Sequence, residues 1–443
     1  MYSSSEHLLL EVARLLTPAP GLGGTVSLVA LGIITCLLQS AGIASLACGF
    51  RLKLRPTLLL AAALWLVMAD AAFFDTYASP YSEGATLTGV LLVAAGLIYL
   101  RRGPLSLCLG LALVAAGGYL ACLSKEQYDL LAIPVCIAVV AISARGRGLA
   151  RFWHPRTVAA TAVAAVIGVS SLLYAYDDAT SPYATLLHQE QIVQMIFVDL
   201  ITPQHGLAAN EADLHALGLP ASWASYAGDG FFAPHSVYHD PLYARYASKL
   251  TDTNLAGFLL SHPVALIRTG QLAADSALQF RAFLGSYSPA AGHPPGTLED
   301  RVAVVSSLVS AIPAGLGLLW LIPLWAVMAA LGWWTLRLRR GLGGWQADCG
   351  CLVLMLTGCA VAAFVPAAFF AGVVRHMTGA NLATALAFVF SAVLLCSLVR
   401  HGIASAEPES EPEPEHEHEH KPVPGVRVPA QPTAPAAAHP AWR

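Results

Sequence analysis

Nine long apolar stretches constrain the fold of this chain more than any other feature of its sequence. A helix that crosses a membrane needs about 20 consecutive apolar residues, and its backbone groups must be hydrogen-bonded within the segment. The stretches are continuous rather than alternating, which favours helices over the strands of a barrel. We therefore predict an all-α, polytopic membrane helical bundle. The predicted spans are 25–48, 57–77, 84–100, 104–123, 129–145, 157–176, 304–334, 351–372 and 378–399.

Two of these spans are irregular. The stretch 129–145 is short and carries Pro134, whereas 304–334 is too long for one simple span. Pro313 and Pro323 predict that the longer stretch kinks or begins as an interfacial helix.

The scarcity of charge agrees with this interpretation and excludes other classes of protein. Only 12% of the 443 residues are charged and 56% are hydrophobic, whereas about 25% of the residues of a soluble domain are charged. This composition excludes a soluble enzyme, a disordered chain and a basic nucleic-acid-binding protein.

The few basic residues predict the orientation of the spans, because cytoplasmic loops carry an excess of lysine and arginine. Alternate connections are basic, and the short connections between them carry only Lys125 and Arg375. We therefore expect a multi-pass protein of a bacterial plasma membrane, with the basic connections and the C-terminal tail in the cytoplasm. The basic set is Arg51, Lys53, Arg55, Arg101, Arg102, Arg145, Arg147, Arg151, Arg156, Arg337, Arg339 and Arg340.

These patterns divide the chain into five predicted parts. The long polar stretch has helical apolar spacing broken by Gly and Pro clusters, and the tail is rich in Pro, Glu and His, a composition typical of disorder. The Glu-His repeat of the tail is interpreted as a solvated spacer more readily than as a weak metal site. The parts are an external amphipathic segment 1–23, six spans in 24–176, an extracytoplasmic helical region 177–302, three spans in 303–400 and a cytoplasmic tail 401–443.

The first candidate site residues are carboxylates in the short loop 73–84, which carries Asp75 and Glu83. A carboxyl group beside the low-dielectric membrane has a raised pKa, which suits a general base. The alternative is that both residues cap helices at the membrane surface.

The second candidates are the two cations that depart from the charge bias. Lys125 follows one span, and Arg375 with its neighbour His376 lies between the last two spans. Cations at the outer surface suit a lipid phosphate. The alternatives are an ion pair of Lys125 with Glu126 or Asp129, and plain snorkelling of Arg375 towards water.

Metal sites receive little support from the sequence. His235 and His239 have the i, i+4 spacing of zinc ligands on a helix, but flanking prolines oppose a continuous helix and favour ordinary loop histidines. The sequence assigns no metal ligand and no cofactor, and it leaves a divalent metal ion open.

Taken together, the outer loops resemble the GT-C superfamily of membrane glycosyltransferases. The matching elements are Ser-Pro-Tyr-Ser-Glu at 79–83, Ser-Lys-Glu-Gln at 124–127 and Arg-His at 375–376, where relatives often carry Arg-Tyr. The similarity covers roughly residues 57–400, and it includes the order of short outer loops followed by one large outer region.

This resemblance implies an inverting hexosyl or pentosyl transfer. The donor is a polyprenyl-phosphate-linked sugar, and the acceptor is a glycan or protein of the cell envelope. An outer carboxylate, Glu83 or Asp75, activates the acceptor hydroxyl, while Lys125, Arg375 and His376 hold the departing lipid phosphate. The implied partners are thus the lipid-linked donor, the envelope acceptor and membrane lipid, and no nucleic acid.

One departure from that family concerns the first span. Such enzymes begin inside the cell, cross once and carry an acidic catalytic residue in the first outer loop, whereas the charge pattern here places residue 1 outside. The resemblance therefore implies that the first span is missing and that 1–16, with Glu6 and Glu11, is the remnant of the first outer loop. Either the encoded protein starts further upstream or this chain has lost the usual base.

Two other functions compete with the enzyme. A transporter or flippase for a lipid-linked substrate would need polar residues along the spans and an internal repeat, and the sequence displays neither clearly. A catalytically inactive GT-C relative that partners an envelope enzyme agrees with the missing first loop.

Overall fold

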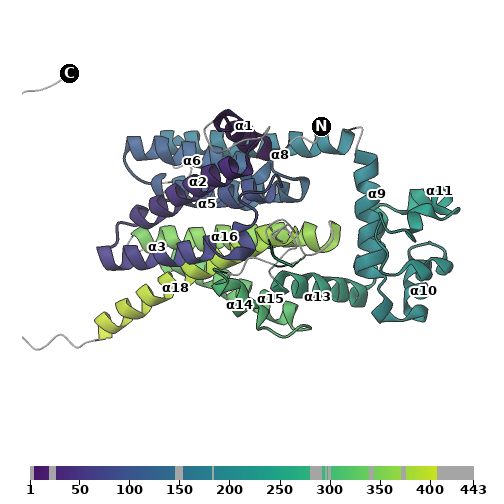
Figure 1. Ribbon diagram of the computed structural model, residues 1–443. Helices are drawn as coiled ribbons and strands as arrows, with labels where there is room; N and C mark the ends of the chain where they lie inside the picture. The colour runs from purple at the N-terminus through teal and green to yellow at the C-terminus, as the bar shows by residue number, and fades with distance from the viewer. Residues whose placement is uncertain are drawn as a thin grey trace, which may run out of the picture. The chain divides into compact units, whose positions relative to one another are not determined.

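The computed structural model of the protein confirms a multi-pass helical bundle (Figure 1). Residues 1–397 form one unit and residues 398–443 a second, and all packing described below lies within the first unit. The structure describes residues 4–18, 26–144, 153–181, 184–279, 292–294, 297, 301–338, 344–370 and 376–406.

Seven helical segments within the described residues are long and apolar enough to cross a membrane, and two further apolar helices are shorter. The shorter two are α3, Leu54–Met68, and α5, Glu83–Tyr99. Together the nine correspond to the nine predicted apolar stretches, and no strand occurs in the described part of the chain. The seven are α2 (Leu28–Gly49), α6 (Pro104–Cys122), a 3₁₀ turn Glu126–Leu131 with α7 (Ala132–Ser143), α8 (Pro155–Thr180), α15 (Gly317–Leu338), α16 (Gly344–Phe370) and α18 (Thr378–Ala406).

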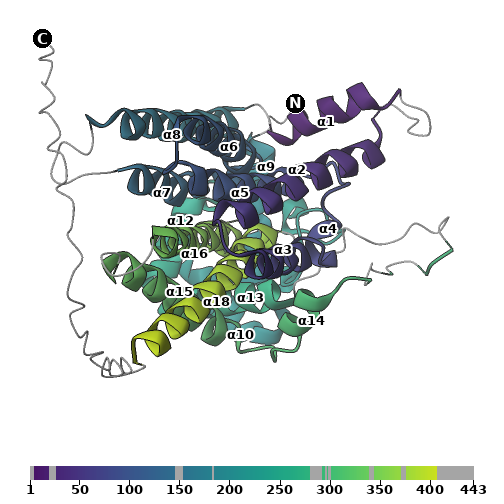
Figure 2. The same ribbon diagram turned by 90° about the vertical axis from the view of Figure 1, so that its left-hand side faces the viewer.

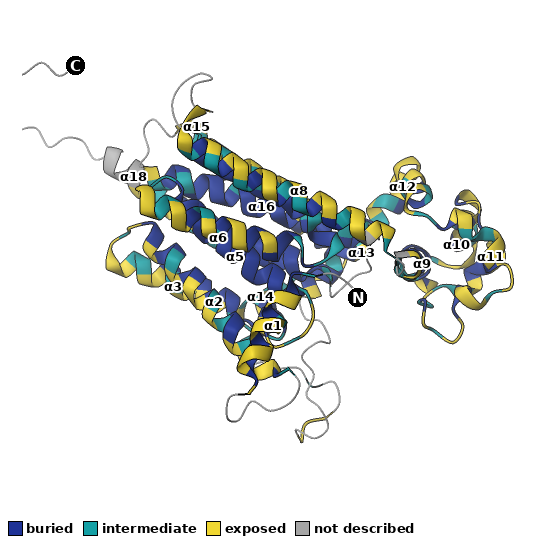
Figure 3. Cartoon of the chain, turned by 90° about the horizontal axis from the view of Figure 1, so that it is seen from above, coloured by how far each residue is buried: buried dark blue, intermediate teal, exposed yellow. Residues whose placement is uncertain are grey.

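Helix α5 lies at the centre of the bundle, and almost every one of its residues is buried (Figure 3). It packs antiparallel to α6 through glycine pairs. A methyl group added at Gly89 would lie 2.4 Å from the backbone nitrogen of Ala121 and 2.5 Å from the carbonyl oxygen of Gly117. Gly96 and Gly110 make a second contact of this kind further along the hairpin. Small residues let transmembrane backbones approach closely, so α5 and α6 are held in one register.

Two aspartates stabilise breaks in segments that the apolar pattern alone would continue as one helix. Asp70 is completely buried and accepts hydrogen bonds from the backbone N–H groups of Val305 and Ser306, at 2.8 and 3.0 Å. It also caps the four-residue helix α4, Ala71–Phe74, so that the predicted span 57–77 ends at Met68.

The predicted span 304–334 is likewise divided into α14, Val304–Ser310, and α15. Asp275 accepts hydrogen bonds from Gly315 and Gly317, both at 3.0 Å, and thereby caps the start of α15. The expected break near Pro313 is confirmed, because this proline lies between the two helices.

The region 184–279 is built from short helices around its own apolar core. Trp223 and Phe197 stack edge to face at 6.1 Å inside this core, and Phe369 of α16 packs against it. A break at His262-Pro263 separates α12 from α13. The elements are α9 (Ala184–Gln194), a π-helical turn (Met195–Leu200), α10 (Leu207–Ala216), α11 (Tyr243–Tyr246), α12 (Asp252–Ser261) and α13 (Pro263–Gln279).

The glycine contact between α5 and α6 generates a stability prediction. We expect Gly89→Ala to destabilise the protein by about 1–3 kcal/mol or more, because the added methyl group meets backbone rather than a movable side chain. Gly103→Ala in the same hairpin is the matched control, since nothing lies within 4 Å of a Cβ at that position. Thermal unfolding of both purified variants measures the effect, and equal unfolding midpoints would contradict the assigned role of Gly89.

Candidate functional site

Three of the predicted site residues meet at one end of the bundle, which we call the site end. Glu83 opens α5 and its side chain is 1% exposed. The ammonium nitrogen of Lys125, just after α6, lies 3.6 Å from Glu83 Oε1 and 2.7 Å from His376 Nδ1. One cation therefore lies between a buried carboxylate and an imidazole whose residue lies two positions before α18.

The antiparallel α5–α6 hairpin explains why Glu83 and Lys125 are neighbours. The residue that begins α5 lies opposite the residues that follow α6, and Thr86 Oγ1 lies 2.5 Å from Ser124 Oγ. The glycine contacts described above fix this register. The sequence pattern predicted the sidedness of both residues, and the helix packing brings them together.

His376 is held by a separate set of contacts. The Gln127 side-chain amide donates a hydrogen bond to the His376 carbonyl at 3.3 Å. Gly379 lies against the Tyr128 ring, since a Cβ there would be 2.7 Å from a ring carbon. The start of α18 is therefore fixed against the 3₁₀ turn that follows Lys125.

The N-terminal residues complete the site end. The last carbonyl groups of a helix have no partner within it. For α6, residues 4 and 5 at the N-terminal end of the chain supply these partners. The Ser5 backbone N–H donates to the Leu123 carbonyl, and the Ser5 hydroxyl donates to the Leu120 carbonyl, each at 2.8 Å. The Ser4 hydroxyl donates to the Ser124 carbonyl at 2.6 Å.

This attachment places Glu6, the first residue of helix α1 (Glu6–Leu16), beside Glu83. Glu6 is buried, and its Oε2 atom accepts a hydrogen bond from the Ala85 N–H at 2.9 Å. Burial, reinforced by the nearby charge of Glu83, raises the pKa of Glu6 to about 8, although the bond from Ala85 opposes the shift.

Sequence reasoning did not select Glu6 as a site residue. A signal was present in its spacing, because Glu6 shares a buried stripe of α1 with Leu9 and Ala13. A carboxylate at i, with apolar residues at i+3 and i+7, lies on the protein-facing side of an amphipathic helix. Only the fold reveals that this side faces Glu83.

The remaining two predicted site residues are Asp75 and Arg375. Asp75 ends α4 and is half-buried, and the carbonyl oxygen of its neighbour Thr76 lies 3.0 Å from where a Cβ on Gly84 would be. The loop that carries Asp75 therefore borders the site. Arg375 lies outside the described residues.

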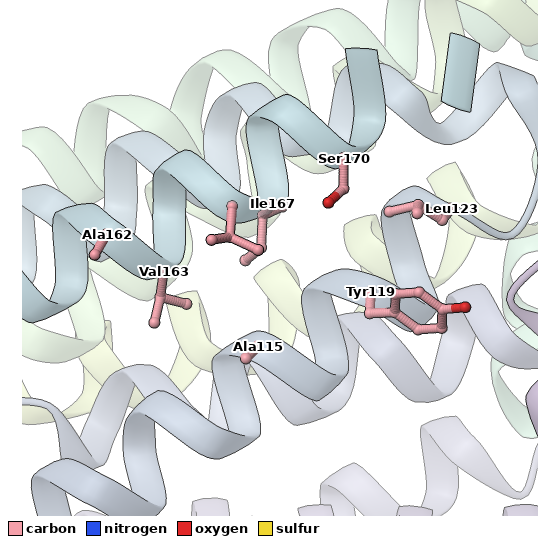
Figure 4. A pocket seen from close by; sticks show the side chains of 8 residues that line it. Ala115, Tyr119, Leu123, Ala162, Val163, Ile167 and Ser170 are labelled. Atoms are coloured by element: carbon pink, nitrogen blue, oxygen red, sulfur yellow. The ribbon is translucent and has the colours of Figure 1, made fainter. Parts of the chain in front are cut away.

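An apolar groove runs between α6 and α8 (Figure 4). Its volume is about 230 Å³, and Leu123, at one end of its lining, is two residues from Lys125. The lining is almost entirely apolar, apart from the hydroxyl groups of Tyr119 and Ser170. The lining residues are Ala115, Tyr119, Leu123, Ala162, Val163, Val166, Ile167 and Ser170.

The described residues contain no cluster of three or more His, Cys, Asp or Glu side chains that could hold a metal ion. His235 and His239 do not share a helix, because the segment between the two flanking prolines forms only a short 3₁₀ turn, Val237–His239. The zinc alternative for these histidines therefore lacks the required helix.

The fold and this polar site at one end of it define a multi-pass membrane protein. Residues 1–405 match the family described as the YfdI N-terminal transmembrane domain, and the chain belongs to this family. Comparison with the curated proteins and with the solved structures gives no significant match.

The raised pKa of Glu6 predicts that docking of the N-terminal segment depends on pH. Docked Glu6 keeps its proton up to about pH 8, whereas a water-exposed glutamate loses it near 4.5. Docking is therefore strongest below pH 4.5 and weakens as the pH rises to about 8, by up to about tenfold per pH unit.

Hydrogen exchange of the amides of residues 5–10, corrected for the intrinsic rate at each pH, measures this docking. Glu6→Gln is the control, because its docking should be the same at pH 5.5 and pH 8.5. Equal protection of the wild-type segment at these two pH values would contradict the prediction.

Proposed function

We propose that this protein is a GT-C-type glycosyltransferase that moves a hexosyl or pentosyl group from a polyprenyl-phosphate carrier to an envelope glycan or protein. The observation that carries the proposal is the position of Lys125, between Glu83 and His376 and two residues along the chain from Leu123, which lines the apolar groove. A lipid-phosphate donor needs a cation at the membrane surface and an apolar path for its tail, and both occur here within a few residues. The motifs at 79–83, 124–127 and 375–376 support the same assignment.

In this proposal Lys125 and His376 hold the phosphate of the leaving lipid. A lysine ammonium group only donates hydrogen bonds, so His376 Nδ1 accepts from Lys125 and the other ring nitrogen keeps its proton as a donor. An ammonium group and an N–H donor fixed before the reaction stabilise the charge that develops on the phosphate. Arg375, next in sequence to His376, is proposed as the third phosphate ligand.

The acceptor hydroxyl needs a base, and the carboxylates of the site end are the proposed source. Glu83 is the principal candidate because of its contact with Lys125, and Asp75 remains a second candidate at the border of the site. The structure adds Glu6, whose pKa of about 8 is in the range where a general base is effective near neutral pH. Attack by the activated hydroxyl opposite the lipid phosphate would invert the configuration of the sugar.

The orientation of the bundle is part of this proposal. The site end faces the outside of a bacterial plasma membrane, and the arginine-rich connections and the tail face the cytoplasm. The support is the charge pattern, together with the ion pair of Arg101 and Asp348, which joins a basic connection to the start of α16.

Replacing the central cation tests the proposed function. We expect Lys125→Ala to lower the transfer rate by about 100-fold or more, because the leaving phosphate loses its ammonium partner. The measurement is sugar transfer from a polyprenyl-phosphate donor by protein reconstituted in vesicles. Lys249→Ala, in the region of short helices, is the control and should transfer at the wild-type rate. Wild-type transfer by a membrane-inserted Lys125→Ala protein would refute the proposal.

Filling the groove tests the proposed path of the lipid tail. Ala162→Trp, on the α8 wall, should raise KM for a long-chain donor by about tenfold with a smaller effect on a short-chain donor, because less apolar surface remains to bind the tail. Val169→Trp, on an exposed part of the same helix outside the groove lining, is the matched control. An equal KM for both chain lengths in Ala162→Trp would exclude the groove as the tail site.

A further inference from the structure

The surface of α1 is divided into three stripes along its 11 residues. One stripe is buried and contains Glu6, Leu9 and Ala13, which face the protein. A second stripe is polar, and in it Arg14 pairs with Glu11 at 2.9 Å. Residues three and four apart share a helix face, so these two stripes account for about half of the helix circumference.

The third stripe is apolar and exposed. Leu8, Val12, Leu15 and Leu16 have exposed fractions of 51%, 37%, 74% and 46%. Their spacing of i, i+4, i+7 and i+8 puts them on one side of the helix. An exposed apolar patch of this kind on a short helix marks an interaction surface rather than a face in contact with water.

The neighbour of α1 indicates what covers this stripe. Leu9 and Ala13 pack against Ala30, Leu31 and Ile34, so that α1 lies against the first turns of the membrane span α2 (Figure 2). The other side of those turns carries exposed apolar residues, including Val29 at 61%, and they face lipid because α2 is a membrane span. The helix α1 therefore packs on a membrane span whose first turns also carry exposed apolar residues.

We propose that α1 lies in the membrane–water interface at the site end, with its exposed apolar stripe among the lipid chains. The partner is the phospholipid surface, and the polar stripe with Glu11 and Arg14 faces the headgroups and water. This is the arrangement of interfacial amphipathic helices, which insert one apolar face while the charged face stays hydrated. The inference does not depend on the proposed transfer reaction.

The lipid contact of α1 affects the site, because α1 begins with Glu6. The lipid contact holds the whole helix against α2 and α5, and it thereby keeps Glu6 beside Glu83. Lipid contact and the hydrogen bonds of Ser4 and Ser5 act on opposite ends of one short segment. Loss of the lipid contact should therefore loosen the attachment of residues 4–6.

Photo-crosslinking in a bilayer tests the lipid contact directly. A benzophenone amino acid replaces Leu15 in one protein and Glu11 in a matched control, each full-length in vesicles of phosphatidylethanolamine and phosphatidylglycerol. We expect the lipid adduct, measured by mass spectrometry, to be at least about fivefold more abundant at position 15 than at position 11. Equal lipid adducts at the two positions, or crosslinks from position 15 to protein alone, would overturn the proposal.

Hydrogen exchange in the same vesicles tests the consequence for Glu6. A Leu15→Gln, Leu16→Gln protein should exchange the amides of residues 5–10 about tenfold faster than wild type, while Glu11→Gln stays within about twofold. Unchanged exchange in the double variant would overturn the coupling between lipid contact and the site. Neither readout involves sugar transfer, so these results and a failure of the proposed function are distinguishable.

Discussion

The close contact of α5 with α6 is the interaction on which the arrangement of the site depends. Glycine at positions 89 and 117 lets the two backbones touch, and any larger residue would force them apart. Because the helices are antiparallel, this contact fixes residue 83 opposite residues 124 and 125. Packing in lipid has little hydrophobic drive between helices, so close backbone contact is the main source of such specificity. Residues without a side chain thereby determine the position of the polar side chains.

The site end also depends on hydrogen bonds that satisfy helix ends. Ser4 and Ser5 complete the last turn of α6, and in doing so they bury Glu6 next to Glu83. Asp70 and Asp275 act in the same way on α14 and α15. An unsatisfied backbone group is costly in an apolar environment, so each of these side chains stabilises one break between helices.

The sequence predicted the helices far better than the contacts between them. Apolar length identified every span, and the sidedness of Glu83, Lys125 and His376 came from the few charges in short loops. The contacts of Asp70 and Glu6 were not predicted, because their hydrogen-bond partners lie about 235 and 79 residues away in the sequence. No local spacing of residues encodes such contacts. A hydropathy pattern shows the length of an apolar segment. The buried carboxylate of Asp70, which ends such a segment, acts through hydrogen bonds from two distant backbone N–H groups.

The central claim is that Lys125 and His376 hold one phosphate group together, and a double-mutant cycle tests it most directly. Binding of a polyprenyl phosphate in vesicles would be compared for the wild type, Lys125→Gln, His376→Ala and the double variant. Two residues that share one ligand group are coupled by about 0.5–3 kcal/mol, so the double variant should lose less affinity than the sum of the single losses. Strictly additive losses, or unchanged binding in the single variants, would contradict the claim.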